Sequence, residues 1–347
     1  MTVHEQANTP HSLSRRVDEL LSRNDYPAAI QLLTTANRAQ RDPAIEQALV
    51  DLRINGFARS ARPQPQNWQP EYSDRFEGIT SIPEVAATEL DVDALSAGIL
   101  GNGGLIVRGL MDQPTVQTMR ANIDRTLLAR RACAQGIEDT DNDRWFERCA
   151  SVQGGPVQFR KDTKMGPVWC VDSPPTAFQL IEFYRSIGLP AILDSYFGEP
   201  AVLSVRKWVL RRVEPNNGAV SGWHQDGQFL GDENIRTVNL WVALTDCGGD
   251  ADAPGIEIVA GNDRQIYQSG SHGAAFDWTV GQELVDELTE SRPVLCPRFN
   301  AGDAIFFDHY NLHRTAFGVD HSCNRYAVES WFFADSTAPA EQQPLLF

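Results

Sequence analysis

The strongest constraint on the fold is a change in sequence pattern near residue 200. Beyond it the chain consists of short runs of β-branched and aromatic residues separated by turn-forming residues, which is typical of strands. Helical periodicity dominates before it, with helices expected near 91–100, 114–133 and 176–196. Helices followed by strands predict a mainly β domain, a sandwich or barrel, with flanking helices. We expect its strands at 201–213, 236–245, 255–260, 303–308 and 325–333.

The N-terminal part of the chain is helical in pattern and precedes a proline-rich segment. Leu13, Val17 and Leu20 share one helical face, and Asp42-Pro43 opens a later helical run. The pattern resembles one tetratricopeptide unit, and because solenoids need several units we favour a helical cap or dimerisation arm over a peptide-binding module. The polar, proline-rich stretch that follows is typical of a linker. We therefore predict a helical extension over 1–60, a linker over 61–79 and the main domain over 80–347.

Charge and cysteine content limit the partners and the compartment. The formal net charge is −16, from 46 acidic and 30 basic residues. Nucleic acids and anionic membranes are bound through basic surfaces, so neither is an expected partner. Six cysteines without a C-x-x-C pair indicate reduced thiols, and no signal-like or membrane-length apolar run is present. We expect a cytoplasmic protein that acts on a small molecule, with self-association or a partner contact through its N-terminal helices.

The segment Trp223-His224-Gln225-Asp226-Gly227 predicts a metal site. On extended backbone, residues i and i+2 project to the same face, so the imidazole of His224 and the carboxylate of Asp226 converge. A third ligand is expected after the buried strand 303–308, where His313 is the first choice and His309 its competitor. Two imidazoles and one carboxylate on one side of an octahedron are the arrangement of non-haem iron(II) oxygenases. An H-x-D pair alone is weak evidence, because such pairs occur by chance.

Arg325 opens the predicted strand RYAVESWFF, in which Arg325, Ala327, Glu329 and Trp331 share one face. A guanidinium at the start of a buried strand requires an anionic partner. One candidate is Glu329, in a structural ion pair. The other is the distal carboxylate of 2-oxoglutarate, held by a two-pronged contact. The residues alone favour the ion pair.

Five sequence blocks resemble one enzyme family. WHQDG, RTVNLWVALTD, PGIEIVAG, AGDAIFFDHYNLHRT and RYAVESWFF occur in the order found in the phytanoyl-CoA dioxygenase family of 2-oxoglutarate oxygenases. The segment GLIVRGLMDQPTVQTMRANID is similar to that family's N-terminal strand and helix. The resemblance spans roughly residues 80–335 and leaves the helical N-terminus outside. It implies a double-stranded β-helix, also called a jelly roll and similar to the cupins, with helices against its major sheet.

The resemblance also implies cofactors and residue roles. Fe(II), 2-oxoglutarate and O₂ would oxidise a small organic substrate, releasing succinate and CO₂. Related halogenases lack the carboxylate ligand, so Asp226 favours hydroxylation or desaturation over halogenation. By position in the blocks, the metal ligands are His224, Asp226 and His313, and the residues at the 2-oxoglutarate are Arg325, Trp241 and Asn239.

The identity of the substrate is poorly encoded. The strand before the metal motif carries a basic cluster, made up of Arg206, Lys207, Arg211 and Arg212. Either this cluster receives an anionic substrate group, or half of its side chains face solvent, and we favour the second interpretation. Gln228 and Phe229 are expected at the entrance, and Arg160 and Lys161 in a lid.

Two rival functions remain on the same fold. One is a non-catalytic metal-binding or sensing protein whose helical arm binds a partner. The other is a cupin-like hydrolase or isomerase that uses zinc or manganese. Neither rival needs a buried arginine at position 325, and activity without O₂ would favour the second.

Overall fold

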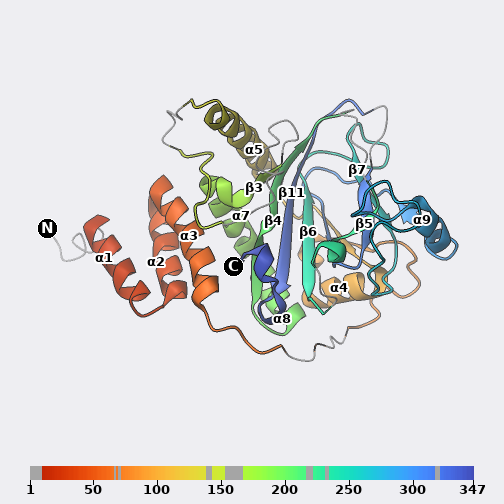
Figure 1. The fold of residues 1–347 in the computed structure, drawn as a ribbon, viewed down its shortest axis with the longest axis horizontal. Coiled ribbons are helices and arrows are strands. Elements are labelled where there is room, and N and C mark those ends of the chain that lie inside the picture. Colours follow the sequence, from red (N-terminus) through yellow and green to blue (C-terminus); the bar gives the residue numbers. More distant parts are fainter. Residues whose placement is uncertain are drawn as a thin grey trace.

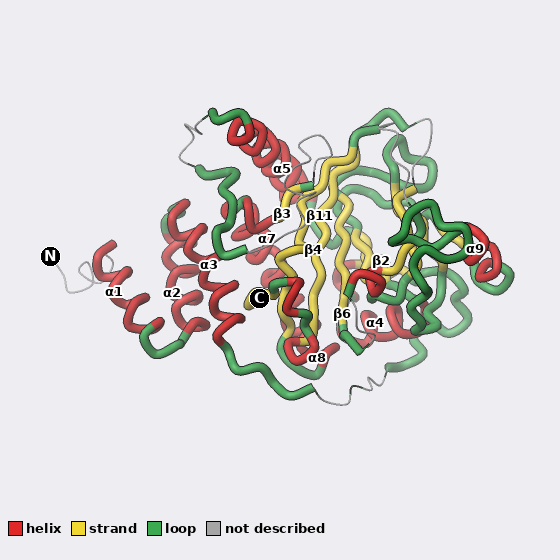
Figure 2. The backbone as a smooth tube through the Cα atoms, in the orientation of Figure 1, coloured by secondary structure: helices red, strands yellow, loops and turns green. Residues whose placement is uncertain are grey.

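The computed structural model describes residues 10–65, 68, 72–137, 143–152, 167–215, 222–230, 234–316 and 321–347. Two β-sheets lie at its centre, and the helices α1, α2, α3 and α7 lie together on one side of them (Figure 1). Helix α9 lies at the opposite end, beyond strands β5 and β7 of the smaller sheet (Figure 1). The architecture is thus a mixture of helices and large sheets, with a helical N-terminal region (Figure 2).

The larger sheet contains eight described strands. Four of them correspond to the predicted strands at 201–213, 236–245, 303–308 and 325–333. Its neighbouring strands are antiparallel apart from the parallel pair β1–β2. The order is β1 (Glu84–Ala86), β2 (Leu105–Arg108), β9 (Ala304–Phe307), β6 (Thr237–Ala243), β11 (Arg325–Ala334), β4 (Ala201–Val213) and β12 (Pro344–Leu346), with β3 (Val168–Trp169) also paired to β4.

The smaller sheet faces the larger one across a shared apolar layer. It has the order β5 (His224–Gln225), β10 (Leu312–Ala316), β7 (Gly255–Val259) and β8 (Val294–Leu295). Ile258 of this sheet and Trp241, Phe307 and Ala327 of the larger sheet belong to one buried cluster. Because side chains alternate across a strand, the same strands of the larger sheet have a second face free for other packing.

Helices cover that second face. Leu240 of β6 and Val328 of β11 lie in one core cluster with Ile123 of α5 (Gln113–Ala134) and Leu180 of α7 (Pro174–Ser186). Each of these four side chains is fully buried, and burying a side chain of this size contributes about 1.5–3 kcal/mol. The larger sheet is therefore held between a helical layer and the smaller sheet.

One predicted helix is divided in two. The sequence predicts a single helix near 176–196, but α7 ends at Ser186 and α8 (Leu189–Phe197) follows after a break. Gly188 at the break has φ = 70°, a left-handed conformation that is costly for residues with a side chain. Pro190 then lies in the first turn of α8, where its missing N–H is tolerated. The prediction of one continuous helix is therefore wrong.

The remaining helices follow the predicted pattern more closely. The N-terminal region forms α1 (Pro10–Leu21), α2 (Tyr26–Ala39) and α3 (Pro43–Arg59), and the carboxylates of Asp25 and Asp42 cap α2 and α3. Helix α4 (Val92–Ser96) runs into a π-helical turn (Ala97–Gly101), and α9 spans Gln282–Thr289. In the parts of the chain that the structure describes, no helix combines the length and apolarity needed to cross a membrane.

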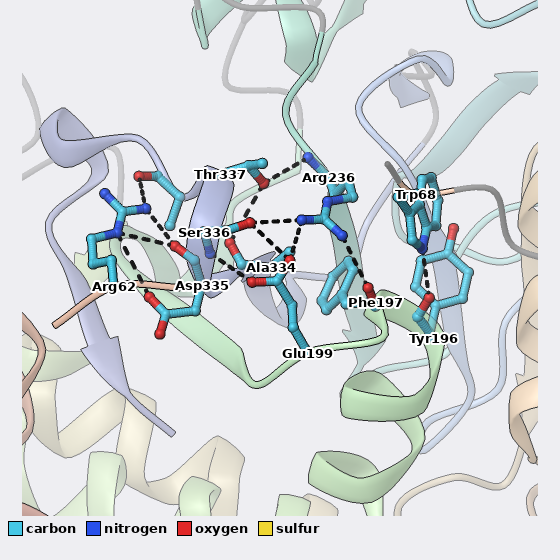
Figure 3. Close-up of polar contacts among 11 residues, drawn as sticks. Arg62, Trp68, Tyr196, Phe197, Glu199, Arg236, Ala334, Asp335, Ser336 and Thr337 are labelled. Carbon is cyan, nitrogen blue, oxygen red and sulfur yellow. Dashed lines mark hydrogen bonds and ion pairs between the residues drawn. The ribbon is translucent and has the colours of Figure 1, made fainter. Parts of the chain in front are cut away.

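Polar contacts attach the N-terminal region to the end of the chain. Helix α3 packs against α7 and β12, and the guanidinium of Arg53 donates a 2.9 Å hydrogen bond to the carbonyl of Leu346. After α3, Arg62 donates to the carbonyls of Asp335 and Ala338 (Figure 3). Nearby, Arg236 before β6 forms an ion pair with Glu199 (Figure 3).

Candidate metal centre and co-substrate site

The sheet ladder brings three potential metal ligands together. His224 on β5 and His313 on β10 are paired residues in the smaller sheet, and their ring centroids are 4.5 Å apart. Asp226 follows β5 as the first residue of a 3₁₀ turn (Asp226–Phe229). One ligand atom from each of the three lies within 4.8 Å of the other two. The three predicted metal ligands are therefore neighbours in space.

Backbone carbonyls orient both imidazoles. Nδ1 of His224 is 3.0 Å from the carbonyl of Gly222, and Nδ1 of His313 is 3.2 Å from that of Asn311. A carbonyl only accepts, so each Nδ1 carries the proton and each Nε2 keeps its lone pair for a metal. Burial lowers the pKa of His224 well below its usual range, and the proximity of His313 lowers it further. His224 is therefore neutral near neutral pH, as ligation requires.

The carboxylate of Asp226 is buried and held by one amide. Asn239 on β6 donates from Nδ2 to Oδ2 of Asp226 at 2.7 Å. Burial raises the pKa of Asp226, while the nearby His313, Lys207 and Asn239 act against that increase. Asn239 was predicted at the co-substrate, and the structure places its amide on the carboxylate of Asp226.

The competing histidine lies outside this group. His309 is buried, and its Nδ1 is 3.1 Å from the hydroxyl of Thr237. Its carbonyl accepts a 2.9 Å hydrogen bond from the backbone of Gly227, which closes the turn after Asp226. Among the described residues, the structure thus brings His313 rather than His309 to the other two ligand atoms.

Arg325 is a buried cation with no carboxylate in direct contact in the described part of the chain. It is 2% exposed, and no described carboxylate oxygen lies within 4.0 Å of its guanidinium. Nη1 donates to the carbonyls of Gly255 (3.2 Å) and Pro254 (3.4 Å), and Nε is buried without a hydrogen-bond partner. The indole of Trp241 lies 5.7 Å from Cζ. Burial lowers the pKa of Arg325 to about 10, so it remains protonated near neutral pH.

Glu329, the alternative partner of Arg325, forms its ion pair with another arginine. Arg211 on β4 contacts Glu329 through two nitrogens, Nε at 2.6 Å from Oε1 and Nη2 at 2.9 Å from Oε2. Burial raises the pKa of Glu329, but Arg211 outweighs this effect and the pKa is lowered overall. The structural ion pair considered for Arg325 is therefore not formed, and the guanidinium of Arg325 remains able to take an anionic ligand.

Strand β7 connects this arginine to the ligand group. Gly255 begins β7 and accepts from Arg325, while Ile258 of the same strand is paired with His313. Gly255 and Ile258 are three residues apart, which corresponds to about 10 Å along a strand. A short dicarboxylate together with its contacts at both ends has about this length. The apolar side chains of Trp241, Ile258 and Phe307 belong to the cluster in this region, and the ring of Phe307 is 4.8 Å from that of His313.

The model of the phytanoyl-CoA dioxygenase (PhyH) family matches residues 100–316, which is more than half of the chain. The chain belongs to this family. The resemblance of the sequence blocks is thus confirmed. PhyH enzymes use Fe(II), 2-oxoglutarate and O₂. No curated protein sequence matches the chain.

This PhyH-family chain is also similar to solved structures of low sequence identity. One is the non-heme alpha ketoglutarate dependent carbocyclase SnoK from nogalamycin biosynthesis, with 17% identity, 72% of this chain and 86% of that chain covered, and a TM-score of 0.46. EctD from S. alaskensis with bound Fe has 15% identity, coverage of 69% and 75%, and a TM-score of 0.48. EvdO2 from Micromonospora carbonacea var. aurantiaca complexed with 2-oxoglutarate has 14% identity, coverage of 70% and 89%, and a TM-score of 0.43.

The side chains present suit the PhyH cofactors. Two imidazoles with available Nε2 atoms and one buried carboxylate form a donor set suited to a ferrous ion. The buried, unpartnered Nε of Arg325 is an orphaned donor that a carboxylate would satisfy. The metal donor set and the guanidinium of Arg325 are independent features, because they lie on different strands and would bind different kinds of ligand.

The predicted basic cluster is dispersed in the structure. Arg211 is paired with Glu329, and Arg212 contacts Asp124 at 2.9 Å. Lys207 has its Nζ over the rings of Phe229 (5.0 Å) and Trp331 (4.4 Å). The cluster is therefore not one anion site, and Lys207 is the member that lies among aromatic rings.

Other predicted residues have varied positions. Phe229 lies beside His224, with ring centroids 5.9 Å apart, whereas the amide of Gln228 bonds to the backbone of Tyr267 and Gln225. Arg160 and Lys161 lie outside the described residues. Sequence reasoning did not identify Trp278, whose ring is 5.6 Å from that of His224. The only signal was an aromatic residue in a polar loop.

Proposed function

We propose that this chain is an Fe(II)- and 2-oxoglutarate-dependent oxygenase that hydroxylates a small organic substrate and releases succinate and CO₂. The observation that carries the proposal is the convergence of His224, Asp226 and His313 at one end of β7, with the unpaired Arg325 at its other end. Either feature alone occurs in many proteins. Their combination matches the requirements of a metal and a dicarboxylate bound side by side.

In this proposal each residue has a defined task. His224, Asp226 and His313 would hold the iron, and bound iron with 2-oxoglutarate and O₂ supplies the oxidising chemistry. The carbonyls of Gly222 and Asn311 keep the Nε2 atoms available. Asn239 fixes the orientation of Asp226.

Arg325 would bind the far carboxylate of 2-oxoglutarate through charge-assisted hydrogen bonds. The indole face of Trp241 lies against the guanidinium and helps to keep it in place. Trp241, Phe307 and Ala327 are each no more than 2% exposed, so water is excluded from this part of the site. A dry environment strengthens the contact between guanidinium and carboxylate.

Asp226 bears on the type of oxidation. A carboxylate at this position occupies the place that a halide would need on the metal, so we propose hydroxylation rather than halogenation. Product analysis tests hydroxylation against desaturation, because only hydroxylation adds an oxygen atom to the substrate.

We further propose that the two sheets form a double-stranded β-helix. Successive strands from β4 to β11 alternate between the larger and the smaller sheet, apart from the pair β7–β8 within the smaller one. Such alternation is what winding two sheets together requires.

We also propose that the chain divides at residues 60 and 79 and that the protein is cytoplasmic. A third proposal is that its N-terminal helices contact a partner or a second copy. The packing of α3 on α7 and β12 favours a supporting role for these helices.

Succinate formation tests the proposal. The purified chain is incubated with Fe(II), ascorbate, 2-oxoglutarate and O₂, and succinate is measured with and without candidate substrates. We expect succinate from the wild type and from His272→Ala, a control at an exposed histidine, but only background from His224→Ala and Asp226→Ala. Metal binding without succinate would instead support the sensing protein. Turnover of a substrate in the absence of O₂ would support the hydrolase or isomerase.

A further inference from the structure

An exposed group of aromatic side chains lies against the candidate metal ligand His224. The rings of Phe229 and Trp278 are 5.9 Å and 5.6 Å from the His224 ring. Phe276 is stacked on Trp278, with centroids 5.5 Å apart and an interplanar angle of 12°. We call Phe229, Phe276 and Trp278 the aromatic group.

The exposure of this group is unusual for the chain. Its members are 37%, 38% and 43% exposed. Eight large hydrophobic side chains are this exposed in the described part of the chain, and three of the eight are in this one group. Clustered exposed rings mark a binding surface more often than isolated ones do. Their contact with His224 places that surface beside the proposed reaction centre.

Lys207 adds a positive charge at one edge of the aromatic group. Its Nζ lies 5.0 Å from the ring centroid of Phe229, and Phe229 in turn lies 6.0 Å from Trp278. No hydrogen bond or ion pair of this ammonium with a described residue is present, and its contacts are the rings of Phe229 and Trp331. Lys207 thus contacts Phe229, Phe229 contacts Trp278 and Trp278 contacts Phe276.

The other charges near Lys207 are already matched. Glu329 is engaged by two nitrogens of Arg211, and Asp226 is hydrogen-bonded by Asn239 and is a ligand in the proposed metal site. Arg325 lies at the far end of β7, where it would serve 2-oxoglutarate. Among the described residues, Lys207 and Arg211 are the cations that act on His224, and Lys207 is the one of the two without a carboxylate within ion-pair distance.

Resting on the proposed function, we infer that Lys207 and the aromatic group form the substrate subsite, and that the substrate is an organic acid with an aromatic ring. The ring stacks on the exposed faces of Trp278 and Phe276. The carboxylate contacts the ammonium of Lys207. The part of the molecule between them lies along Phe229 and faces His224, so the carbons between ring and carboxylate are those presented for oxidation.

Binding of matched acids and amides tests the inference. The protein is loaded with Mn(II), which cannot support turnover, and with 2-oxoglutarate, whose own binding is measured first. Benzoate, phenylacetate, 3-phenylpropanoate and their primary amides are then titrated, with tryptophan fluorescence and calorimetry as readouts. We expect at least one acid to bind about tenfold or more tightly than its amide, a difference of about 1.4 kcal/mol.

Three variants assign the effect to side chains. Lys207→Met should abolish the preference for acid over amide, and Lys207→Arg should restore most of it because the charge is kept. Trp278→Ala should weaken acid and amide alike, by about tenfold. Arg298→Met, at an exposed arginine elsewhere, should leave both affinities unchanged. Equal binding of acid and amide to the wild type, or an unchanged preference in Lys207→Met, would overturn the inference.

Chemical labelling gives a result that does not depend on a folded variant. The chain has three lysines, Lys161, Lys164 and Lys207. Reductive methylation of the wild type, read by peptide mass spectrometry, should be slowed at Lys207 by the bound acid but not by its amide. Equal protection by acid and amide, or no protection by any acid, would contradict the inference. Failure of 2-oxoglutarate to bind would count against the proposed function instead. Labelling and the fluorescence titration, repeated on the metal-free protein, would then still test the subsite.

Discussion

The amide of Asn239 on β6 donates a 2.7 Å hydrogen bond to the carboxylate of Asp226, and both side chains are buried. The contact joins the larger sheet to the turn after β5, in which the candidate metal ligand Asp226 lies. On burial, the carboxylate of Asp226 loses its hydrogen bonds to water. The amide of Asn239 replaces one of them and fixes the orientation of the carboxylate. Asn239 is therefore a positioning residue for Asp226.

Replacing Asn239 with alanine should weaken metal binding. Loss of a residue that orients a metal ligand typically lowers metal affinity about 10–100-fold, and we expect that range for Mn(II) or Fe(II) measured by calorimetry. Asn55→Ala, at an exposed position of α3, is the matched control and should bind metal normally. Unchanged affinity in a folded Asn239→Ala protein would show that Asp226 needs no support from β6.

Replacing Arg325 should weaken 2-oxoglutarate binding and leave metal binding intact. Arg325→Met removes a charge-assisted contact worth about 1.5–3 kcal/mol, while keeping an apolar side chain against Trp241. Calorimetry of the Mn(II)-loaded protein measures the loss directly. Arg325→Lys should recover part of the affinity, since it restores the charge but not the two-pronged geometry. Normal co-substrate affinity in Arg325→Met would exclude Arg325 as the anchor.

The two histidines after β9 should differ sharply in their effects on metal binding. His313→Ala removes a proposed ligand and should abolish tight binding of Fe(II). His309→Ala removes a side chain whose Nδ1 contacts Thr237, so we expect lower thermal stability with metal affinity close to that of the wild type. Metal titrations and melting curves of both variants decide the matter. The opposite result would exchange the roles of His309 and His313.

The raised pKa of Asp308 leads us to expect a pH dependence of stability that does not involve the candidate metal ligands. Burial raises its pKa from 3.8 to about 6, and the amide of Asn262 and the backbone N–H of Tyr310 only partly counteract this. A raised pKa means that the folded state favours the protonated acid. Its contribution to stability is therefore fully present below about pH 4 and is lost as the pH rises through about 6.

The matched comparison for this effect is Asp308→Asn, which cannot ionise. Relative to the wild type, its free energy of unfolding should improve by roughly 1–3 kcal/mol between about pH 4 and about pH 7. Urea denaturation at each pH gives this difference, and a constant offset from an altered hydrogen bond does not affect its slope. A difference that does not change with pH would mean that Asp308 ionises normally in the folded chain.

The fold could be predicted from sequence wherever a strand is long and apolar. The predicted strands 201–213 and 325–333 agree with β4 and β11 within one residue, because their residues are buried on both sides. The two-residue strands β5 and β8 carry too few residues for a pattern, and β10 contains His313 and Arg314 in place of an apolar run. These strands exist because their partners in the smaller sheet hold them, which is a tertiary effect.

The candidate site shows the same division between local and tertiary information. The i, i+2 spacing brought His224 and Asp226 together as predicted, although Asp226 lies in a 3₁₀ turn rather than on the strand. The pairing of Glu329 with Arg211 instead of Arg325 could not be read from one strand, because it depends on the neighbouring strand β4. Trp278 was not identified, because its loop reaches His224 only in the folded chain.

The most direct test of the central claim is an anaerobic titration of the metal-free chain with Fe(II) in the presence of 2-oxoglutarate. We predict a weak visible charge-transfer band that saturates at one iron per chain, disappears in His224→Ala and requires more 2-oxoglutarate in Arg325→Met. A folded wild-type chain that develops no band dependent on 2-oxoglutarate at any iron concentration would contradict the account.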